Sequence, residues 1–442
     1  MEQLQYDQVN GVSIVSPVAQ YNGNIASQSW GTSSSPDSAA FVYTYDQLNR
    51  LTSGMSADSN FAEQNITYDQ GGNIQSLSRT YNGDVIDNLS YIYTNNGVQG
   101  NQLQQITNSS SLGTMYGPGI SAGTFGYAYD GNGNMIADTG KSVFIQYNIL
   151  NLPQAISPNP IQTGNRIILT AVQPSAYQYD ADGTKLMMRS GIRPYNITYY
   201  ISGIQYDYSP TLDSLTLTFV QTEDGRVFPY SADTSNYYEY NLADHLGNNR
   251  IAFDNPGNAR ATVEQQDNYL PFGMEISQLV NSPKNEYLYN GKELQEAFNL
   301  YDYGARFYDP VIGRWMSVDP LAEDDEDLSP YIYGENNPIL MTDPDGMSAE
   351  ETTNVEEEKP KPAPKPIELK EVTIKGYVAK KQHLGSYEYT IYVPDEATAK
   401  ANRKQLGDFL GKWTPLGREV MAYLSTVDLV KHMDFSRLER QE

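Results

Sequence analysis

The sequence predicts a mainly β protein, and three observations support this prediction. Tyrosine is unusually abundant, with 36 residues in a chain of 442, and tyrosine is enriched in strands. The chain also holds 35 glycines and only 19% charged residues, a composition typical of short strands joined by tight turns. The third observation is a repeated unit of the form Y-x-Y-D-x-x-G/N-x-hydrophobic.

The repeated unit predicts one β-hairpin per copy. Two tyrosines at positions i and i+2 lie on the same face of a strand. The Asp or Asn that follows starts a turn through its side chain, and a Gly or Asn supplies positive φ. Stacked hairpins bury a shared ladder of rings, because each unit rests on its neighbour. The copies centre on Tyr43, Tyr45 and Asp46; Tyr68 and Asp69; Tyr127, Tyr129 and Asp130; Tyr147 and Asn148; and Tyr177, Tyr179 and Asp180.

Charge and composition limit the classes of function. The net charge is −25, and nearly all of it falls before Ser348, so we expect the body not to bind nucleic acid. No apolar run reaches the roughly 18 residues that a membrane-spanning helix needs, and we expect no membrane span. The chain has no cysteine, which excludes disulfides and thiolate metal sites. Its first residues, MEQLQYDQVNG, do not have the basic and apolar regions of a secretory signal.

The most informative segment is 287–347. Three Asp-Pro pairs, which begin at Asp309, Asp319 and Asp343, punctuate tyrosine-rich stretches, and the composition changes abruptly at Ser348. Further upstream the chain reads D-H-L-G-N-N-R. Together these segments resemble the RHS-repeat-associated core domain that ends the β-shell of bacterial RHS/YD-repeat proteins, a polymorphic toxin family.

The resemblance implies a fold and a division into domains. It implies that the YD-repeat hairpin sheet coils into a shell, and the length of this body favours a partial shell capped by the core domain. A small α+β segment is expected at the C-terminus, where strand-like alternation precedes helical periodicity. The expected parts are the YD-repeat β-shell 1–238, the core domain 239–347, a Pro/Glu-rich linker 348–366 and a variable C-terminal domain 367–442.

The resemblance also implies that the protein cuts itself. Family members are cut after D-P-x-G-L/M, which reads DPDGM here, so the expected scissile bond joins Met347 to Ser348. The resemblance selects Asp319 and Asp343 as a catalytic pair, since two close carboxylates that share one proton can act as acid and base. Arg314, in the G-R-W segment, is expected to hold one carboxylate in place or to stabilise the oxyanion.

Several of these residues also have a purely structural interpretation. Asp-Pro often starts a turn, because Pro fixes φ and Asp accepts backbone hydrogen bonds, and we favour this interpretation for Asp309. For Asp319 and Asp343 we favour catalysis, on the strength of the resemblance. His245, beside Asp244 in the D-H-L-G segment, is interpreted as a hydrogen-bonded turn residue.

The resemblance implies that the C-terminal segment is a variable effector. Its expected partners are the shell that holds it, a separately encoded immunity protein and components of a secretion machine. No motif names its activity: His383 and His432 are scattered, and no metal-binding or phosphate-binding motif occurs, so we expect no cofactor and no metal site. We expect a secreted or cell-surface protein, exported without a recognisable signal peptide or encoded by a truncated gene.

Two alternatives stay open at this point. The first is a structural protein of the cell surface whose tyrosine rings contact carbohydrate and which does not cut itself. The second is a truncated, silent RHS cassette left by recombination. Cleavage after Met347 distinguishes the leading interpretation from both.

Overall fold

The structure is a computed structural model. It describes residues 2–6, 17–32, 35–95, 98–113, 119–158, 161–163, 166–168, 174–191, 195–209, 213–229, 237–254, 261–280, 284–324, 326–352, 377–384 and 387–394. The chain divides into two compact units, Met1–Asn354 and Val355–Glu442. In the second unit, β33 (Tyr377–Leu384) and β34 (Tyr387–Pro394) form an antiparallel hairpin. The helices expected in the C-terminal domain fall outside the described residues.

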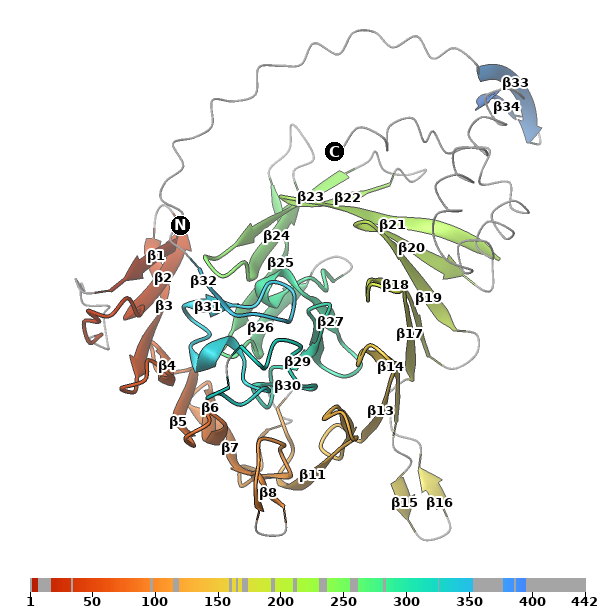
Figure 1. Cartoon of the computed structure of the whole chain (residues 1–442). Helices are drawn as coiled ribbons and strands as arrows, with labels where there is room; N and C mark the ends of the chain where they lie inside the picture. Colours follow the sequence, from red (N-terminus) through yellow and green to blue (C-terminus); the bar gives the residue numbers. More distant parts are fainter. Residues whose placement is uncertain are drawn as a thin grey trace. The chain divides into compact units, whose positions relative to one another are not determined.

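The first unit contains an antiparallel sheet of 22 strands, which confirms the prediction of a mainly β protein. Each strand pairs with the next one along the chain, except that β7 pairs with β10 and β14 with β17. The skipped strands form two separate hairpins, β8 (Thr94–Asn95) with β9 (Val98–Gln99) and β15 (Ile161–Thr163) with β16 (Arg166–Ile168). Figure 1 shows this sheet curving around the strands of the core segment.

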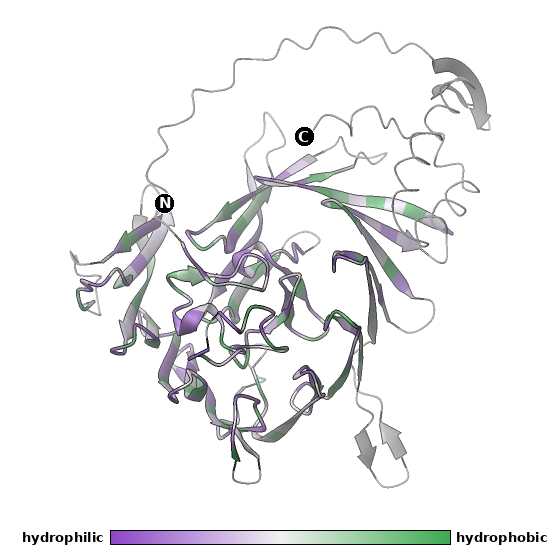
Figure 2. Cartoon of the chain, viewed as in Figure 1, coloured by the Kyte–Doolittle hydropathy of each residue, from purple (hydrophilic) through white to green (hydrophobic). Residues whose placement is uncertain are grey.

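The strands of the sheet are β1 (Glu2–Gln5), β2 (Ser27–Thr32), β3 (Ser35–Tyr45), β4 (Leu51–Ser56), β5 (Ala62–Tyr68), β6 (Ile74–Tyr81), β7 (Asp84–Ile92), β10 (Gln105–Asn108), β11 (Gly123–Tyr129), β12 (Met135–Asp138), β13 (Val143–Tyr147), β14 (Pro153–Pro158), β17 (Ser175–Tyr179), β18 (Lys185–Ser190), β19 (Asn196–Ile201), β20 (Ile204–Ser209), β21 (Ser214–Thr222), β22 (Gly225–Phe228), β23 (Tyr237–Ala243), β24 (Asn249–Asp254), β25 (Thr262–Tyr269) and β26 (Glu275–Val280). Figure 2 shows hydrophobic and hydrophilic residues mixed along the same strands, as expected where one face of a sheet is buried.

Each YD unit folds as the sequence predicts, into a strand, a turn and a second strand. In the first unit, Asp46 Oδ1 accepts the amide hydrogens of Leu48 at 2.9 Å and Arg50 at 3.0 Å. Asn49 has the positive φ, at 65°. The second tyrosine then ties the hairpin to its predecessor, because the Tyr45 hydroxyl donates to the Ile25 carbonyl at 2.8 Å. The same tyrosine contact recurs from Tyr68 to Leu51 at 2.5 Å and from Tyr179 to Pro153 at 2.9 Å.

The core segment forms a small four-stranded sheet and two short 3-10 turns. The sheet contains β27 (Glu293–Gln295), β28 (Leu300–Asp302), β29 (Phe307–Asp309) and β30 (Arg314–Trp315). The turns are η1 (Tyr289–Gly291) and η2 (Gly334–Asn336), and β31 (Met341–Thr342) pairs with β32 (Glu350–Glu351). A buried aromatic cluster packs the segment together: Tyr289, Tyr301, Tyr303, Tyr308, Trp315 and Tyr333.

Buried cations join the large sheet to the core segment. Arg79 on β6 pairs with Glu63 at 2.8 Å and Asp87 at 3.3 Å, and it also donates to the carbonyls of Pro310 at 3.0 Å and Val311 at 2.7 Å. All three charged side chains are fully buried. The core carbonyls accept hydrogen bonds from the guanidinium and so help to offset the cost of removing its charge from water.

A second cation makes the same kind of connection farther along the sheet. Lys185 on β18 pairs with Asp302 at 2.6 Å and with Glu293, both in the core sheet. Within the described residues, β1 and β26 each pair with one strand only, so the sheet has two edges here. Complete or partial closure of the shell, and the proposed domain boundaries, stay predictions.

Candidate active site

The turn that contains the expected cleavage motif is built around Asp343. Its Oδ1 atom accepts three amide hydrogens in succession, from Asp345 at 3.3 Å, Gly346 at 2.7 Å and Met347 at 3.0 Å. Gly346 has φ +82°, a conformation that side chains rarely adopt, so the glycine of the motif is required by the turn. The carboxylate therefore shapes the chain immediately before the expected scissile bond.

Arg306 brings the two expected catalytic aspartates together. Its Nη2 atom lies 2.8 Å from Asp319 Oδ2 and 3.0 Å from Asp343 Oδ2. The guanidinium stacks over the Trp315 ring at 4.2 Å from the ring centroid, and its Nε donates to the Gly346 carbonyl at 2.5 Å. One buried arginine thus holds both carboxylates and the backbone of the cleavage turn.

Asp319 reaches this cluster from the end of a different loop. Its amide donates to the Pro330 carbonyl at 3.1 Å, and its Oδ1 accepts the Leu321 amide at 2.8 Å. Its side chain keeps 22% of its surface exposed, whereas that of Asp343 keeps 2%. The two carboxylates therefore differ strongly in their access to water.

A small pocket adjoins the cluster. It has a cavity volume of about 70 Å³ and is lined by Arg306, Asp319 and Asp343 together with Met347 and Ser348. That volume has room for more than one water molecule, and its lining supplies polar partners for them. The residues of the expected scissile bond and both carboxylates thus border the same space.

Burial shifts the ionisation of the groups around this pocket. It raises the pKa of Asp343 above its usual range, against the opposing effects of the Arg306 charge and the backbone amides. Burial also lowers the pKa of Arg306, although the two carboxylates oppose that shift. A raised pKa at one member of a carboxylate pair is the asymmetry that acid and base roles require.

Arg314 lies elsewhere. Its guanidinium donates to Asn73 Oδ1 and to the Tyr93 hydroxyl, both at 3.0 Å, and to the Asn101 carbonyl at 2.7 Å. It connects the core segment to the turns of the large sheet, and within the described residues the ion pairs of both catalytic-candidate aspartates are with Arg306. Sequence reasoning did not single out Arg306, although it stands only eight residues earlier, in A-R-F-Y-D-P.

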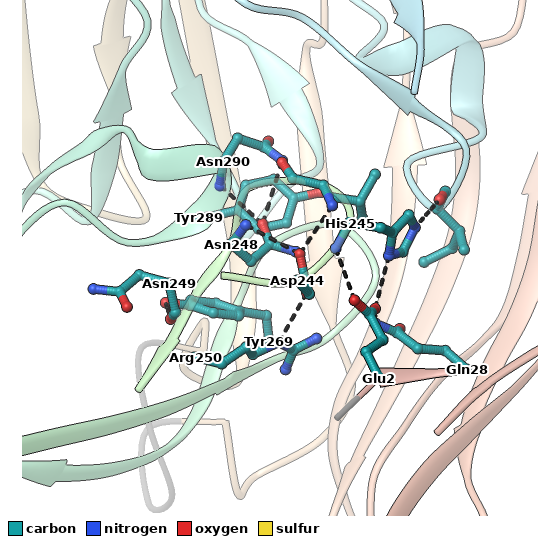
Figure 3. Close-up of polar contacts among 12 residues, drawn as sticks. Glu2, Gln28, Asp244, His245, Asn248, Asn249, Arg250, Tyr269, Tyr289 and Asn290 are labelled. Atoms are coloured by element: carbon teal, nitrogen blue, oxygen red, sulfur yellow. Dashed lines mark hydrogen bonds and ion pairs between the residues drawn. The ribbon is translucent and has the colours of Figure 1, made fainter. Parts of the chain in front are cut away.

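The other Asp-Pro aspartate and the D-H-L-G segment have structural surroundings. Asp309 is buried, pairs with Lys141 at 3.2 Å and accepts the Val311 amide at 3.0 Å. His245 lies in a turn closed by Asp244, and its ring contacts Glu2 on one side and the Ile339 carbonyl on the other (Figure 3). Among the described residues, no cluster of three or more His, Asp or Glu is arranged to hold a metal ion. No helix in those residues has the length and apolar character to cross a membrane.

No family model matches the chain, but several individual proteins are similar to parts of it. The tRNA3(Ser)-specific nuclease WapA of Bacillus spizizenii is 26% identical over 308 residues, which make up 68% of this chain and 12% of that protein. Toxin subunit YenC2 of Yersinia entomophaga is 50% identical over 60 residues, or 14% of this chain and 6% of that protein. The chain therefore spans only a small part of the length of these relatives.

Among solved structures, the crystal structure of TcdB2-TccC3 without its hypervariable C-terminal region matches with a TM-score of 0.48 and 17% identity, covering 73% of this chain and 17% of that one. The similarity to WapA covers about two thirds of this chain, and the large sheet contains hairpins formed by the tyrosine-aspartate units. The chain is thus homologous over most of its length to the WapA proteins, in agreement with its resemblance to the RHS/YD-repeat proteins of the polymorphic toxin family.

Proposed function

We propose that this protein cuts its own chain between Met347 and Ser348 with a pair of aspartates. The observation that supports the proposal most directly is the position of Arg306, whose Nη2 atom lies within 3.0 Å of a carboxylate oxygen of both Asp319 and Asp343. The pocket beside them is bordered by both residues of the bond to be cut.

The proposed roles follow from exposure and charge. Asp319, the more exposed carboxylate, takes a proton from a water molecule whose oxygen attacks the Met347 carbonyl carbon. Asp343, whose pKa burial raises, donates its proton to the carbonyl oxygen. When the tetrahedral intermediate collapses, the C–N bond breaks, the proton held by Asp319 passes to the Ser348 nitrogen, and one hydroxyl proton of the new carboxyl group returns to Asp343. Arg306 keeps the carboxylates in place and limits their mutual repulsion.

Intact-mass spectrometry of the purified full chain tests this proposal. The wild type should give two fragments, the second beginning at Ser348, whereas Asp319→Asn and Asp343→Asn should give one chain of 49.4 kDa. Asp324→Asn is a matched control, because it changes another carboxylate that lines the same pocket. An intact wild-type chain, or full cleavage in both folded active-site variants, contradicts the proposal.

The wider function proposed is the delivery of a C-terminal effector in competition between bacteria. The shell and core would hold residues 348–442 and release them after the cut, at the cell surface or after secretion. The WapA relatives are named as tRNA nucleases, which makes RNA cleavage the first activity to assay for this segment. Growth of bacteria that express the full chain, with and without the product of the neighbouring gene, tests for a live effector and its immunity protein.

The rival function is a surface protein that contacts carbohydrate without cutting itself. One relative named for a surface location, salivary gland surface protein 1 of Aedes aegypti, is 37% identical over 117 residues. The same mass measurement decides between the two functions, because a carbohydrate-contacting scaffold has no need of a new N-terminus at Ser348.

A further inference from the structure

Three successive carbonyl groups are held in place just before the expected scissile bond. The Pro344 carbonyl accepts from Lys292 Nζ, the Asp345 carbonyl accepts from the Ala305 amide at 3.0 Å, and the Gly346 carbonyl accepts from Arg306 Nε. The next carbonyl in the series belongs to Met347. Only two soft torsions, φ and ψ of Met347, separate this carbonyl from the peptide that Arg306 holds, so the three held carbonyls restrict the space in which it can lie.

Lys292 makes its contact from a well-anchored position. Its backbone closes the η1 turn, since its amide donates to the Tyr289 carbonyl at 3.0 Å and its carbonyl accepts the Leu288 amide at 2.9 Å. The neighbouring Asn290 side chain donates to the Leu246 carbonyl at 2.9 Å, within the D-H-L-G turn (Figure 3). The lysine is thus fixed to the sheet at one end and to the cleavage turn at the other.

The charges around Lys292 suit a cation that holds this turn. The charges of Asp302 on β28 and of Asp343 and Asp345 in the turn act on its ammonium group, which also lies 5.4 Å from the centroid of the Tyr303 ring. Burial nevertheless lowers the pKa of Lys292, and the three carboxylates only partly oppose that shift. Lys292 therefore loses its proton at a lower pH than an ordinary lysine does. Its hydrogen bond to the turn loses the support of the positive charge at that pH.

We propose that Lys292 is a positioning residue for the cleavage at Met347–Ser348, acting through the Pro344 carbonyl. The role rests on the proposed function. Lys292 does not touch the bond to be cut; together with the Ala305 amide and Arg306 it fixes the turn so that the Met347 carbonyl meets the aspartate pair. A displacement of about 1 Å at a reacting centre can slow a reaction by roughly 100-fold, so loss of this contact should be visible in the cleavage rate.

The rate is best followed by pulse-labelled cell-free synthesis of the full chain, with the appearance of the fragment that begins at Ser348 as the signal. Lys292→Met should cut roughly 10- to 100-fold more slowly than the wild type. Lys292→Arg keeps a charged donor and should stay within about threefold of the wild-type rate. Lys284→Met is the matched control, since Lys284 is also a partly buried lysine but pairs with Glu275 at 3.5 Å and Glu296 at 2.8 Å.

A second readout does not depend on cleavage. In the Asp319→Asn background, Lys292→Met should increase hydrogen exchange at the Gly346 and Met347 amides, while Lys292→Arg should restore their protection. As the pH rises through the lowered pKa of Lys292, the wild-type rate should fall relative to that of the arginine variant, because a guanidinium does not lose its proton there.

The outcomes separate this role from the proposed function. If the wild type cuts, Asp319→Asn does not, and Lys292→Met cuts as fast as Lys284→Met with unchanged amide protection, the positioning role is overturned while the aspartate mechanism stands. If the wild type does not cut at all, the aspartate mechanism and the role of Lys292 fall together.

Discussion

Glu2 and His245 are joined by two hydrogen bonds, although they stand 243 positions apart in the chain. Glu2 accepts the His245 amide at 3.0 Å and contacts its Nδ1 at 2.9 Å, while Nε2 of the same ring lies 2.9 Å from the Ile339 carbonyl. A ring with an acceptor at each nitrogen is best satisfied when both nitrogens carry hydrogen. The first strand, the D-H-L-G turn and the core segment therefore meet at the imidazole ring of His245.

This contact should make stability depend on pH. Burial opposes the charge on His245, but Glu2 and Asp244 outweigh it and raise its pKa above 6.5. The stabilisation is thus fully present below about pH 6.5 and is lost as the pH rises through the raised value. His245→Gln should lower the free energy of unfolding by about 1–2 kcal/mol at pH 5.5 and by clearly less at pH 9, measured by urea titration. An equal loss at both pH values would show that the ring is held without its charge.

Buried acids should also make the folded protein less stable as the pH rises. Burial raises the pKa of Asp138 to about 6 and the pKa values of Asp267 and Glu286 to about 7, with nearby carboxylates adding to the shift. Their protonated forms favour the folded state, so stability should fall as the pH rises from about 4 to 7 and then level off. Asp267→Asn should make this fall shallower in urea titrations at several pH values, whereas Asp182→Asn, at an exposed turn, should leave it unchanged.

Arg79 on β6 should contribute far more to the free energy of unfolding than the partly exposed Arg50. Arg79→Met leaves Glu63 and Asp87 buried without their cation, and should reduce the free energy of unfolding by about 3–5 kcal/mol. Arg50→Met removes a more exposed pair with Asp46 and should reduce it by about 1 kcal/mol or less. Urea unfolding of both variants in an uncut background measures the difference, and equal losses would contradict the assigned role of the β6 site.

Two buried arginines of the core segment should behave differently toward cleavage. Arg306→Met removes the only side chain described here that pairs with both aspartates, and should abolish the cut. Arg314→Met removes contacts to Asn73, Tyr93 and Asn101, and should lower stability while a folded fraction still cuts. Mass spectrometry combined with circular dichroism measures both effects. Loss of cleavage in a folded Arg314→Met variant would indicate that Arg314 takes a direct part in the cleavage.

Much of the large sheet could be predicted from the sequence because its signals are local. The tyrosines, the turn aspartate and the residue with positive φ all act within a few positions of one another, as Tyr45, Asp46 and Asn49 illustrate. The meeting of Asp319 and Asp343 could be anticipated only through the resemblance, since their separation in sequence carries no information about distance.

The choice of arginine shows where prediction from sequence stops. Arg306 and Arg314 both stand next to aromatic residues in the same short segment, and both are almost completely buried. Which one faces the aspartates is decided by the pairing of β29 with β30 and by stacking on Trp315, which are tertiary relationships. Lys292 was missed for the same reason. Its partner is a backbone carbonyl, and every residue has a carbonyl, so the residue types do not show which one accepts the hydrogen bond.

The pairing of each strand with its successor has a consequence for the order of events during synthesis. Such a sheet can grow hairpin by hairpin behind the ribosome, since its contacts join neighbours in the chain. The core segment, by contrast, contacts residues that are synthesised long before it. Arg79 donates to the Val311 carbonyl, 232 positions later in the chain, and the Ser329 amide beside the pocket donates to the Gly71 carbonyl. A nascent chain therefore carries the two carboxylates in an unassembled state until the sheet is ready to receive them. If the chain cuts itself as proposed, a polypeptide that has stalled or misfolded upstream would have no completed pocket and would stay uncut.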